Sequence, residues 1–247
     1  MKKILILTIL IFSSILSKAY CSPLISGIST NEINIDTKFK GAQILLFGAK
    51  GDAGNIVITV RGPKKNFFVT RKEKIVGIWY NATRLKFENS YSFFSLFSSY
   101  KGLEIDEDIL NDLELTKDFL QFSNEQKYDN KTKDDFRIEL IDEMERRKLY
   151  NNTADKIDFL DDTLFKIMLN FPKNIVQGVY TVELHLIKEN SLISFQSIPI
   201  YVNQVGISAK ISELSRQKEI FYGLVAVVLA LVVGWITNYI FMRFIGQ

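Results

Sequence analysis

Basic and aromatic side chains gather in one stretch of the sequence, where they could bind an anionic partner. The stretch contains Arg61, Lys64, Lys65, Arg71, Lys72, Lys74, Trp79 and Tyr80. A basic surface with an aromatic edge suits lipid headgroups, an anionic polymer or an acidic protein face. The candidate binding surface comprises Arg61, Arg71, Lys72, Trp79 and Asn81. Two alternatives stay open: Trp79 could belong to the core, and Arg61-Gly62-Pro63 could be only a turn that Gly62 permits and Pro63 fixes.

His185 is the only histidine, and it offers little chemistry on its own. A zinc site needs three or four His, Cys or carboxylate ligands, and the one cysteine, Cys21, falls in a segment that we expect to be removed. The sequence also lacks the G-x-S-x-G elbow of a serine hydrolase. We therefore predict a surface or half-buried His185, no metal, no cofactor and no catalytic residue.

Two further motifs resemble ligand sites but are better explained as structure. The acidic run Glu104–Glu114 lacks the glycine that a calcium loop needs, and Ile109-Leu110 interrupts it, so the start of a helix is favoured. The Gly-rich segment Gly48–Gly54 contains Lys50 but not the G-x-x-x-x-G-K-[ST] order of a phosphate-binding loop. We expect a hairpin loop there.

The two ends of the chain indicate where the protein lies. Residues 1–21 combine two lysines with an apolar run and small residues, which is typical of a cleaved secretory signal. Residues 220–242 carry no charge, and as a helix they span roughly 34 Å, enough to cross a membrane. Within them Ala226, Ala230 and Gly234 recur every four residues, either as a helix–helix contact or as ordinary filler. Residues 243–247 form the tail.

Between these ends the sequence divides into β, α and β blocks. Residues 22–102 contain short β-branched runs between turn signals, which predict strands. Residues 103–172 predict three helices, because apolar residues recur at helical spacing and no Gly or Pro occurs from Leu103 to Asn170. Thr132 and Thr153 are expected to cap the second and third helices. Residues 173–207 alternate strictly and predict the last strands, followed by a linker over 208–219.

This order predicts a mainly β fold: an immunoglobulin-like β-sandwich with an acidic helical insertion. Between Leu103 and Asn170 the sequence holds 19 acidic and 10 basic side chains, against 28 and 31 in the whole chain. The rest of the chain is therefore strongly basic. Such a separation indicates either that the helical unit docks on the β part or that it presents an ionic partner surface, unless both are simply solvated faces.

The strand segments and the C-terminal apolar run resemble one known family. Its characteristic parts are IVITVRGP (Ile56–Pro63), VTRKEKIVGIWYNA (Val69–Ala82), GVYTVELHLI (Gly178–Ile187) and the membrane segment opening FYGLVAVVLALVVGW. Together these resemble the alphaproteobacterial putative transmembrane protein family, over both β blocks and the anchor. The resemblance implies an architecture and a membrane location, and no particular activity. The G-x-Y-x-V pattern is also common in immunoglobulin-like sandwiches, which bears on fold and not on function.

These patterns lead us to expect a single-pass protein of the bacterial inner membrane, with its N-terminal domain in the periplasm and its tail in the cytoplasm. The expected role is non-enzymatic: binding or assisting another envelope or membrane protein. The expected partners are the lipid bilayer, through residues 220–242, and a membrane protein or a second copy, but not nucleic acid. The alternative is an envelope enzyme that acts on polysaccharide through two carboxylates. A sensor that acts through its tether is a third reading.

Overall fold

The computed structural model describes residues 23–51, 54–100, 105–120, 122, 129–206 and 219–244, without the side chains of 152–155, 219, 221 and 244. The predicted signal over 1–21, residues 208–218 of the predicted linker and residues 245–247 of the tail lie outside this part of the chain.

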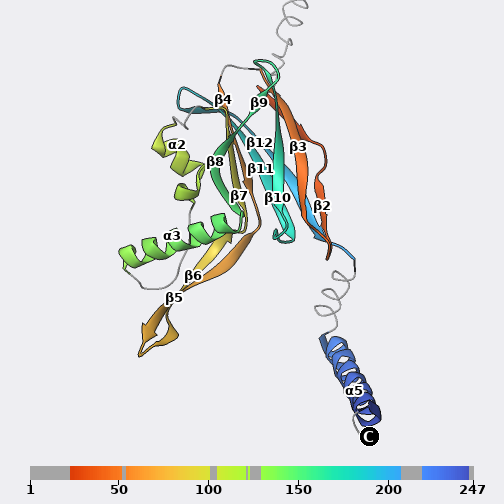
Figure 1. Ribbon diagram of the computed structural model, residues 1–247. Coiled ribbons are helices and arrows are strands. Elements are labelled where there is room, and N and C mark those ends of the chain that lie inside the picture. The colour runs from red at the N-terminus through yellow and green to blue at the C-terminus, as the bar shows by residue number, and fades with distance from the viewer. Residues whose placement is uncertain are drawn as a thin grey trace, which may run out of the picture.

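Two β-sheets form the body of the protein (Figure 1). The four-stranded sheet has the order β1-β3-β10-β9, and the six-stranded sheet has the order β2-β12-β11-β4-β7-β8. The strands of the first sheet are β1 (Leu24–Ile28), β3 (Gly41–Lys50), β10 (Leu164–Pro172) and β9 (Asp158–Phe159). Those of the second are β2 (Glu32–Ile35), β12 (Ser191–Gln204), β11 (Gly178–Lys188), β4 (Asn55–Arg61), β7 (Phe94–Ser98) and β8 (Tyr150–Lys156). The prediction of a mainly β fold is confirmed.

One hydrophobic core lies between the two sheets. Leu46 of β3 and Phe165 of β10 are buried in the same cluster as Ile58 of β4 and Leu184 of β11. Alternate residues of these strands face the core, as a pleated strand requires. Strands from the first β block pair with later strands, β3 with β10 and β4 with β11. The two sequence halves therefore build both sheets together.

Helices lie in the middle of the chain and at its C-terminal end. They are α2 (Glu107–Asp112), the short 3-10 helix η1 (Lys117–Phe119), α3 (Asn130–Arg146) and α5 (Glu219–Phe244). Glu107 and Asp108 lie in the first turn of α2, as predicted for the acidic run. Phe136, Leu140 and Met144 form the buried stripe of α3. The cap of α3 is Asp129, whose carboxylate accepts the Thr132 amide, so the prediction of Thr132 as the cap is wrong.

The third predicted helix is also wrong, because residues 150–172 form β8, β9 and β10. In β10, Phe165, Ile167, Leu169 and Phe171 are buried and alternate with more exposed residues, which is the period of a strand. Two of those exposed residues, Leu164 and Met168, are apolar. An apolar residue on each face produces helical and strand spacings at once, and the sequence pattern could not separate them. The helical part of the predicted insertion therefore ends at Arg146.

The Gly-rich segment joins the two sheets and is not a hairpin loop. β3 pairs with β1 and β10, whereas β4 pairs with β11 and β7. Gly48 lies within β3, where a Cβ atom would come within 2.5 Å of the Phe165 ring and 2.7 Å of the Ile25 carbonyl oxygen. The glycine is thus required by close packing between strands, which a turn pattern does not predict.

Candidate functional site

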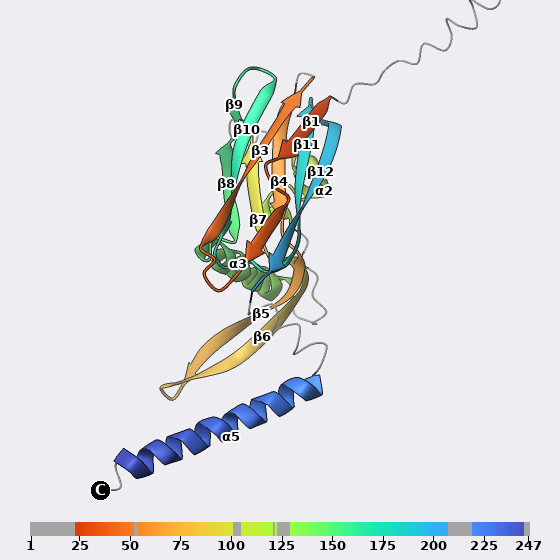
Figure 2. The ribbon, with the colours of Figure 1, turned by 90° about the vertical axis from the view of Figure 1, so that its right-hand side faces the viewer.

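The main candidate site is a two-stranded arm formed by β5 (Lys64–Ile75) and β6 (Ile78–Tyr91). This arm extends the β4–β7 pair: Arg61 faces Phe94 and Lys64 faces Tyr91 in one continuous register. Within the described residues, β5 and β6 pair only with each other. Figure 2 shows the arm projecting beyond the end of the body. It presents the aromatic and most of the basic residues of the predicted binding surface.

Gly62 and Pro63 form the joint between the body and the arm. A Cβ atom on Gly62 would lie 2.8 Å from both Phe93 Cβ and Ser92 Oγ, so a side chain has no room there. Pro63 packs against Gly178, where an added Cβ would lie 2.8 Å from Pro63 Cγ. The two strands stay linked across the joint, because Gly62 N–H donates to the Phe93 carbonyl and Ser92 N–H donates to the Pro63 carbonyl. The alternative that Arg61-Gly62-Pro63 is a turn is therefore wrong: strand pairing continues across the joint, and Gly62 is required by close packing.

Three of the five predicted binding residues lie together on one face of the arm. Lys72 is directly opposite Asn81, and Lys74 is directly opposite Trp79. The Lys74 ammonium lies 5.9 Å from the centre of the Trp79 ring. Trp79 is 65% exposed, so it belongs to the surface and not to the core. Lys72, Trp79 and Asn81 form what we call the outer face.

Arg71 lies on the opposite face of the arm and contacts α3. Its guanidinium is 3.6 Å from the Asp135 carboxylate and 4.9 Å from the centre of the Phe136 ring. A cavity of about 420 Å³ opens between arm and helix, lined by Val69, Thr70, Arg71, Asp135, Phe136, Ile138 and Glu139. We call this cavity the α3 groove. It joins basic and acidic side chains beside the exposed Ile138, a mixture that suits a peptide or protein segment.

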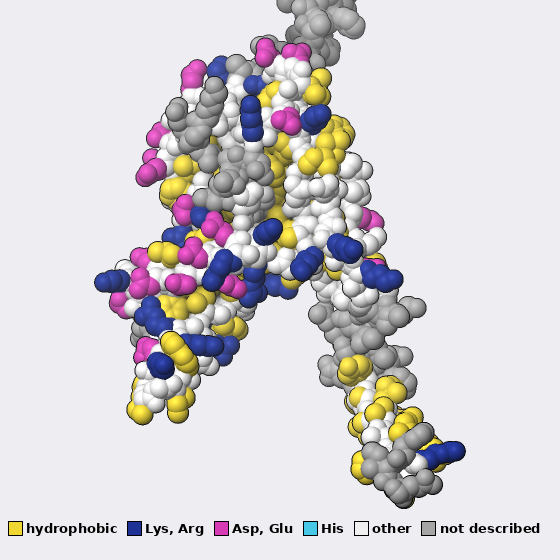
Figure 3. Space-filling model, in the orientation of Figure 1, with side chains coloured by type: hydrophobic (Ala, Val, Ile, Leu, Met, Phe, Trp, Pro, Cys, Tyr) yellow, Lys and Arg dark blue, Asp and Glu magenta, His cyan; other side chains and the backbone are white. Residues whose placement is uncertain are grey.

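The tip of the arm carries exposed apolar side chains on both faces. Ile75, Val76, Ile78 and Trp79 are 57%, 95%, 73% and 65% exposed. Val76 and Gly77 form the turn, both with positive φ. Figure 3 shows hydrophobic side chains at the end of the arm, with lysine and arginine side chains behind them. From Lys64 to Tyr91 the sequence holds seven basic and two acidic residues. Exposed apolar groups of this kind mark interaction sites.

Arg61 is the predicted binding residue that the structure separates from the others. Its side chain is 12% exposed and its guanidinium lies 2.7 Å from the Glu183 carboxylate. The same guanidinium donates to the carbonyl oxygens of Leu113 and Glu114, at the C-terminal end of α2. Arg61 therefore holds the acidic helical segment against the six-stranded sheet. The helical part thus contacts the β part through backbone carbonyls at Arg61 and through one exposed ion pair, Arg71–Asp135.

His185 is buried, which corrects the prediction of a surface or half-buried residue. It is 2% exposed and its ring centre lies 5.2 Å from that of Phe195. Among the described residues its Nδ1 atom has no hydrogen-bond partner. Burial and then the charge of Arg61 lower the pKa of His185 to about 4, and a hydrogen bond with the Val57 backbone opposes them. The imidazole is therefore neutral at pH 7.

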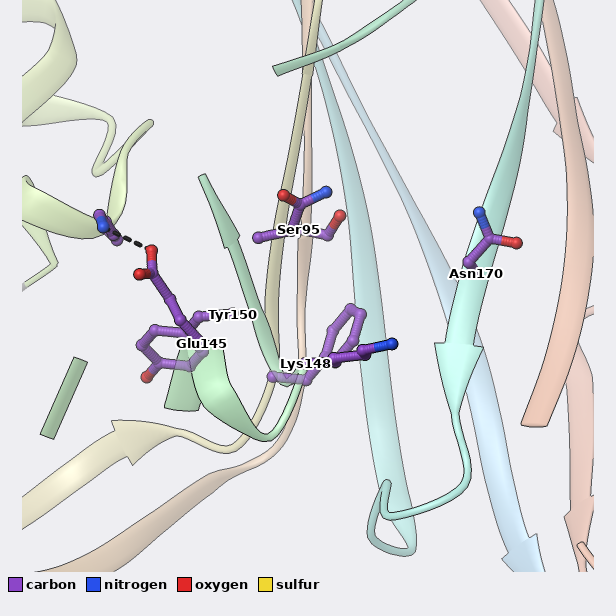
Figure 4. A pocket seen from close by; sticks show the side chains of 8 residues that line it. Ser95, Glu145, Lys148, Tyr150 and Asn170 are labelled. Carbon is purple, nitrogen blue, oxygen red and sulfur yellow. Dashed lines mark hydrogen bonds and ion pairs between the residues drawn. The ribbon is translucent and has the colours of Figure 1, made fainter. Parts of the chain in front are cut away.

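Another cleft, of about 570 Å³, lies between the open edges of the two sheets. Its lining residues are Phe93, Ser95, Lys117, Glu145, Lys148, Tyr150, Asn151 and Asn170. Glu145 is the one carboxylate among them, and it is paired with Lys117. In Figure 4 the Glu145 side chain points away from Asn170 toward that pairing. Burial raises the pKa of Tyr150, so its hydroxyl stays protonated and donates to the Tyr91 carbonyl.

The predicted membrane segment is a helix. α5 contains a candidate span, Tyr222–Arg243, with a mean hydropathy of 2.3. Ala226, Ala230 and Gly234 recur on one side of α5 and all three are exposed. A Cβ added at Gly234 would meet nothing within 4 Å. The structure leaves room at this small-residue face for another helix.

Sequence reasoning missed the apolar tip and the helical side of the α3 groove. The tip sequence Ile75-Val76-Gly77-Ile78-Trp79 is typical of a strand, and only its central glycine signals an exposed turn. Asp135 gives no signal of its own, because its contact with Arg71 joins residues 64 positions apart. Among the described residues, no group of three or more His, Cys, Asp or Glu side chains is placed to hold a metal ion.

A family model shows the relationship that the sequence motifs indicated. The model described as Putative transmembrane protein (Alph_Pro_TM) matches residues 23–243. The match includes both sheets, the arm, the helices and nearly all of α5. No curated protein and no solved structure matches the chain. The chain belongs to the Alph_Pro_TM family of transmembrane proteins.

Proposed function

We propose that this protein is an accessory protein of the bacterial inner membrane that binds another envelope or membrane protein, and that it acts by binding and not by catalysis. In this proposal α5 crosses the membrane once, the two-sheet body stands in the periplasm and the short tail lies in the cytoplasm. The signal-like pattern of residues 1–21 and the apolar C-terminal helix support this orientation.

We further propose that the body is an immunoglobulin-like β-sandwich. The order β1-β3-β10-β9 corresponds to strands A, B, E and D, and β2-β12-β11-β4-β7 corresponds to A′, G, F, C and C′. Tyr180, near the start of β11, donates its hydroxyl to the Val176 carbonyl and accepts the Val176 amide. A tyrosine at this place that bonds to the backbone just upstream is a hallmark of the fold. Sandwiches of this type often serve as rigid supports for binding loops.

The observation that carries the binding proposal is the α3 groove. Arg71, Asp135 and Glu139 offer charges of both signs beside the exposed apolar Ile138. The α3 groove lies between β5 and α3, two elements that lie side by side at one end of the body (Figure 1). A polar rim around an apolar centre matches the usual composition of protein interfaces.

The polysaccharide-enzyme alternative has less support. Two facing carboxylates, on the order of 5 to 10 Å apart, are needed for glycoside hydrolysis. The cleft between the sheet edges contributes only Glu145, which is paired with Lys117. Asp161 and Asp162 line another cavity of about 400 Å³, but they are neighbours in one turn and do not face each other across a cleft.

Site-specific crosslinking in intact membranes tests the binding proposal. A photoreactive amino acid at Ile138 should yield an adduct with a membrane protein, and Arg71→Glu should reduce the yield by disrupting the groove. Ile25 of β1 is the matched control, because both side chains are 58% exposed. Equal adducts from Ile25 and Ile138, or none from Ile138, would count against a partner in the α3 groove.

A further inference from the structure

The apolar tip differs from the α3 groove in the kind of surface that could cover it. Ile75 and Ile78 are directly opposite each other on one face of the arm, and Trp79 lies on the other face. Val76 lies in the turn itself. Apolar groups therefore lie on both faces of the end of the arm and at its turn, with Lys74 beside Trp79. A lipid layer can contact both faces and the turn at once, and it accepts the lysine at its polar boundary. The geometry of the tip thus favours lipid.

The charges behind the tip fit the same surface. Lys74 is next to Ile75 in sequence, and Lys72 lies two residues further from the tip. At about 3.3 Å per strand residue, Lys74 and Lys72 lie roughly 7 and 13 Å from Val76 at the turn, measured along the strand. The headgroup layer on each side of a bilayer is about 5 to 8 Å thick. A tip immersed in that layer would place lysine ammonium groups at its aqueous boundary, and Trp79 within it.

The position of the membrane tether also agrees. Pro63, at the base of the arm, packs against Gly178, and Gly178 pairs with Val202 near the end of β12. The arm and the chain that leads to α5 therefore leave the body at the same end (Figure 2). Gln204 and Glu219 bound fourteen intervening residues, so chain length limits their separation to at most about 50 Å. A second contact with the membrane, through the arm, would fix the distance between the body and the bilayer, which the length of the tether does not fix.

We propose that the tip of the arm, Ile75 to Trp79, inserts into the headgroup layer of the phospholipid bilayer that α5 crosses, with Lys72 and Lys74 on anionic headgroups. The body is then held at two points, α5 and the arm. This inference goes beyond the proposed protein partner and needs none. It gives the exposed tryptophan and the basic flank one common role.

The chain offers a direct test because it contains two tryptophans, Trp79 and Trp235. In a full-length Trp235→Phe protein, Trp79 is the only indole. Single chains are placed in nanodiscs of equimolar phosphatidylcholine and phosphatidylglycerol, with bromine labels either near the headgroups or near the bilayer centre. We expect blue-shifted Trp79 emission, quenched more strongly by the shallow label. Water-like emission without quenching would overturn the proposal, and so would emission that shifts only when two chains share a disc, since a second copy would then cover the tip.

Two further experiments identify which side chains are responsible for insertion of the tip. Val76→Asp with Ile78→Asp should lower the ratio of inserted to free tip at least about 100-fold, because two apolar side chains are replaced by charged ones. Leu192→Asp is the matched control, since Leu192 is an exposed apolar residue of the β11–β12 hairpin at the other end of the body. Pure phosphatidylcholine should weaken quenching, and equal quenching in both lipids would remove the role of the lysines. If the double variant misfolds, the depth measured on the parent protein still decides. Neither result depends on the crosslinks from Ile138.

Discussion

At the scale of single residues, Arg61 and Arg71 show how differently two similar sequence positions can be used. Both are basic residues near the ends of strands, and both were assigned to one surface from sequence. Arg61 is enclosed between Glu183 and the carbonyls of Leu113 and Glu114, whereas Arg71 forms a pair whose side chains are 47% and 51% exposed. Removing one partner of an enclosed ion pair strongly lowers the free energy of unfolding, whereas removing one partner of an exposed pair changes it little.

Replacing Arg61 by alanine should therefore destabilise the protein by about 3 to 5 kcal/mol, because the Glu183 carboxylate and two carbonyls lose their partner. Arg71→Ala should cost less than about 1 kcal/mol. Chemical denaturation of the two variants in the same detergent measures both values. Equal losses would mean that Arg61 does not secure the helical segment.

His185 gives the body a dependence on pH. Its pKa is lowered to about 4 by burial and by Arg61, against about 6.5 in the unfolded chain. Between these values the unfolded chain binds a proton that the folded protein does not, so stability is full above pH 6.5 and falls as pH decreases toward 4. The loss is about 3 kcal/mol and ends below pH 4.

His185→Gln should flatten the stability curve over this window. Urea denaturation at a series of pH values gives the slope for each protein, and only the difference between the slopes is interpreted. Carboxylates with lowered pKa values, such as Asp129 and Glu143, titrate in both proteins and cancel in that difference. Parallel curves would contradict a neutral buried His185.

At the scale of elements, the sequence was informative where one periodicity dominated. The alternation in Gly178–Lys188 and the helical stripe of Phe136, Leu140 and Met144 both predicted what forms. It failed at β10, where exposed Leu164 and Met168 add a false helical spacing. It also failed to show that β4 and β7 continue into the arm, because pairing across the sheet is a long-range property that local spacing does not contain. For the same reason, the sequence-based prediction placed Arg61 on one binding surface with residues of the arm, from which the structure separates it.

The small-residue face of α5 carries a separate prediction. Replacing Ala226, Ala230 and Gly234 by leucine should abolish close helix–helix contact, because bulky side chains keep the backbones apart. Crosslinking in membranes between cysteines placed on this face, or to a neighbouring helix, measures the change. The same three-leucine replacement at Val228, Val232 and Ile236, two residues further along the helix, is the control. Unchanged crosslinking in both would identify the small residues as filler.

At the scale of the whole molecule, the buried residues that stabilise the fold are separate from the exposed tip of the arm and from the anchor, which we propose contact the membrane. The hydrophobic core extends from the two sheets to α3 and to Leu85 and Phe87 at the base of the arm, whereas every residue from Lys72 to Ala82 is exposed. Arg71 and Thr83 are direct partners in the arm, so two residues suffice to join them. A chain in which Asn-Gly replaces residues 72–82 therefore keeps the base of the arm and loses its tip.

This shortened chain should unfold with a free energy within about 1 kcal/mol of the parent value, since no buried apolar surface is removed. It should also keep the α3 groove, because Val69, Thr70 and Arg71 remain beside Asp135 and Phe136. Crosslinking from Ile138 should then persist. The distance from the body to the bilayer, measured by fluorescence transfer to a labelled lipid, should become broad because α5 alone holds the body. A stable shortened chain that keeps a narrow distance would mean that the tip does not fix the body, whereas a loss of the Ile138 adduct would extend the partner's binding surface to the tip.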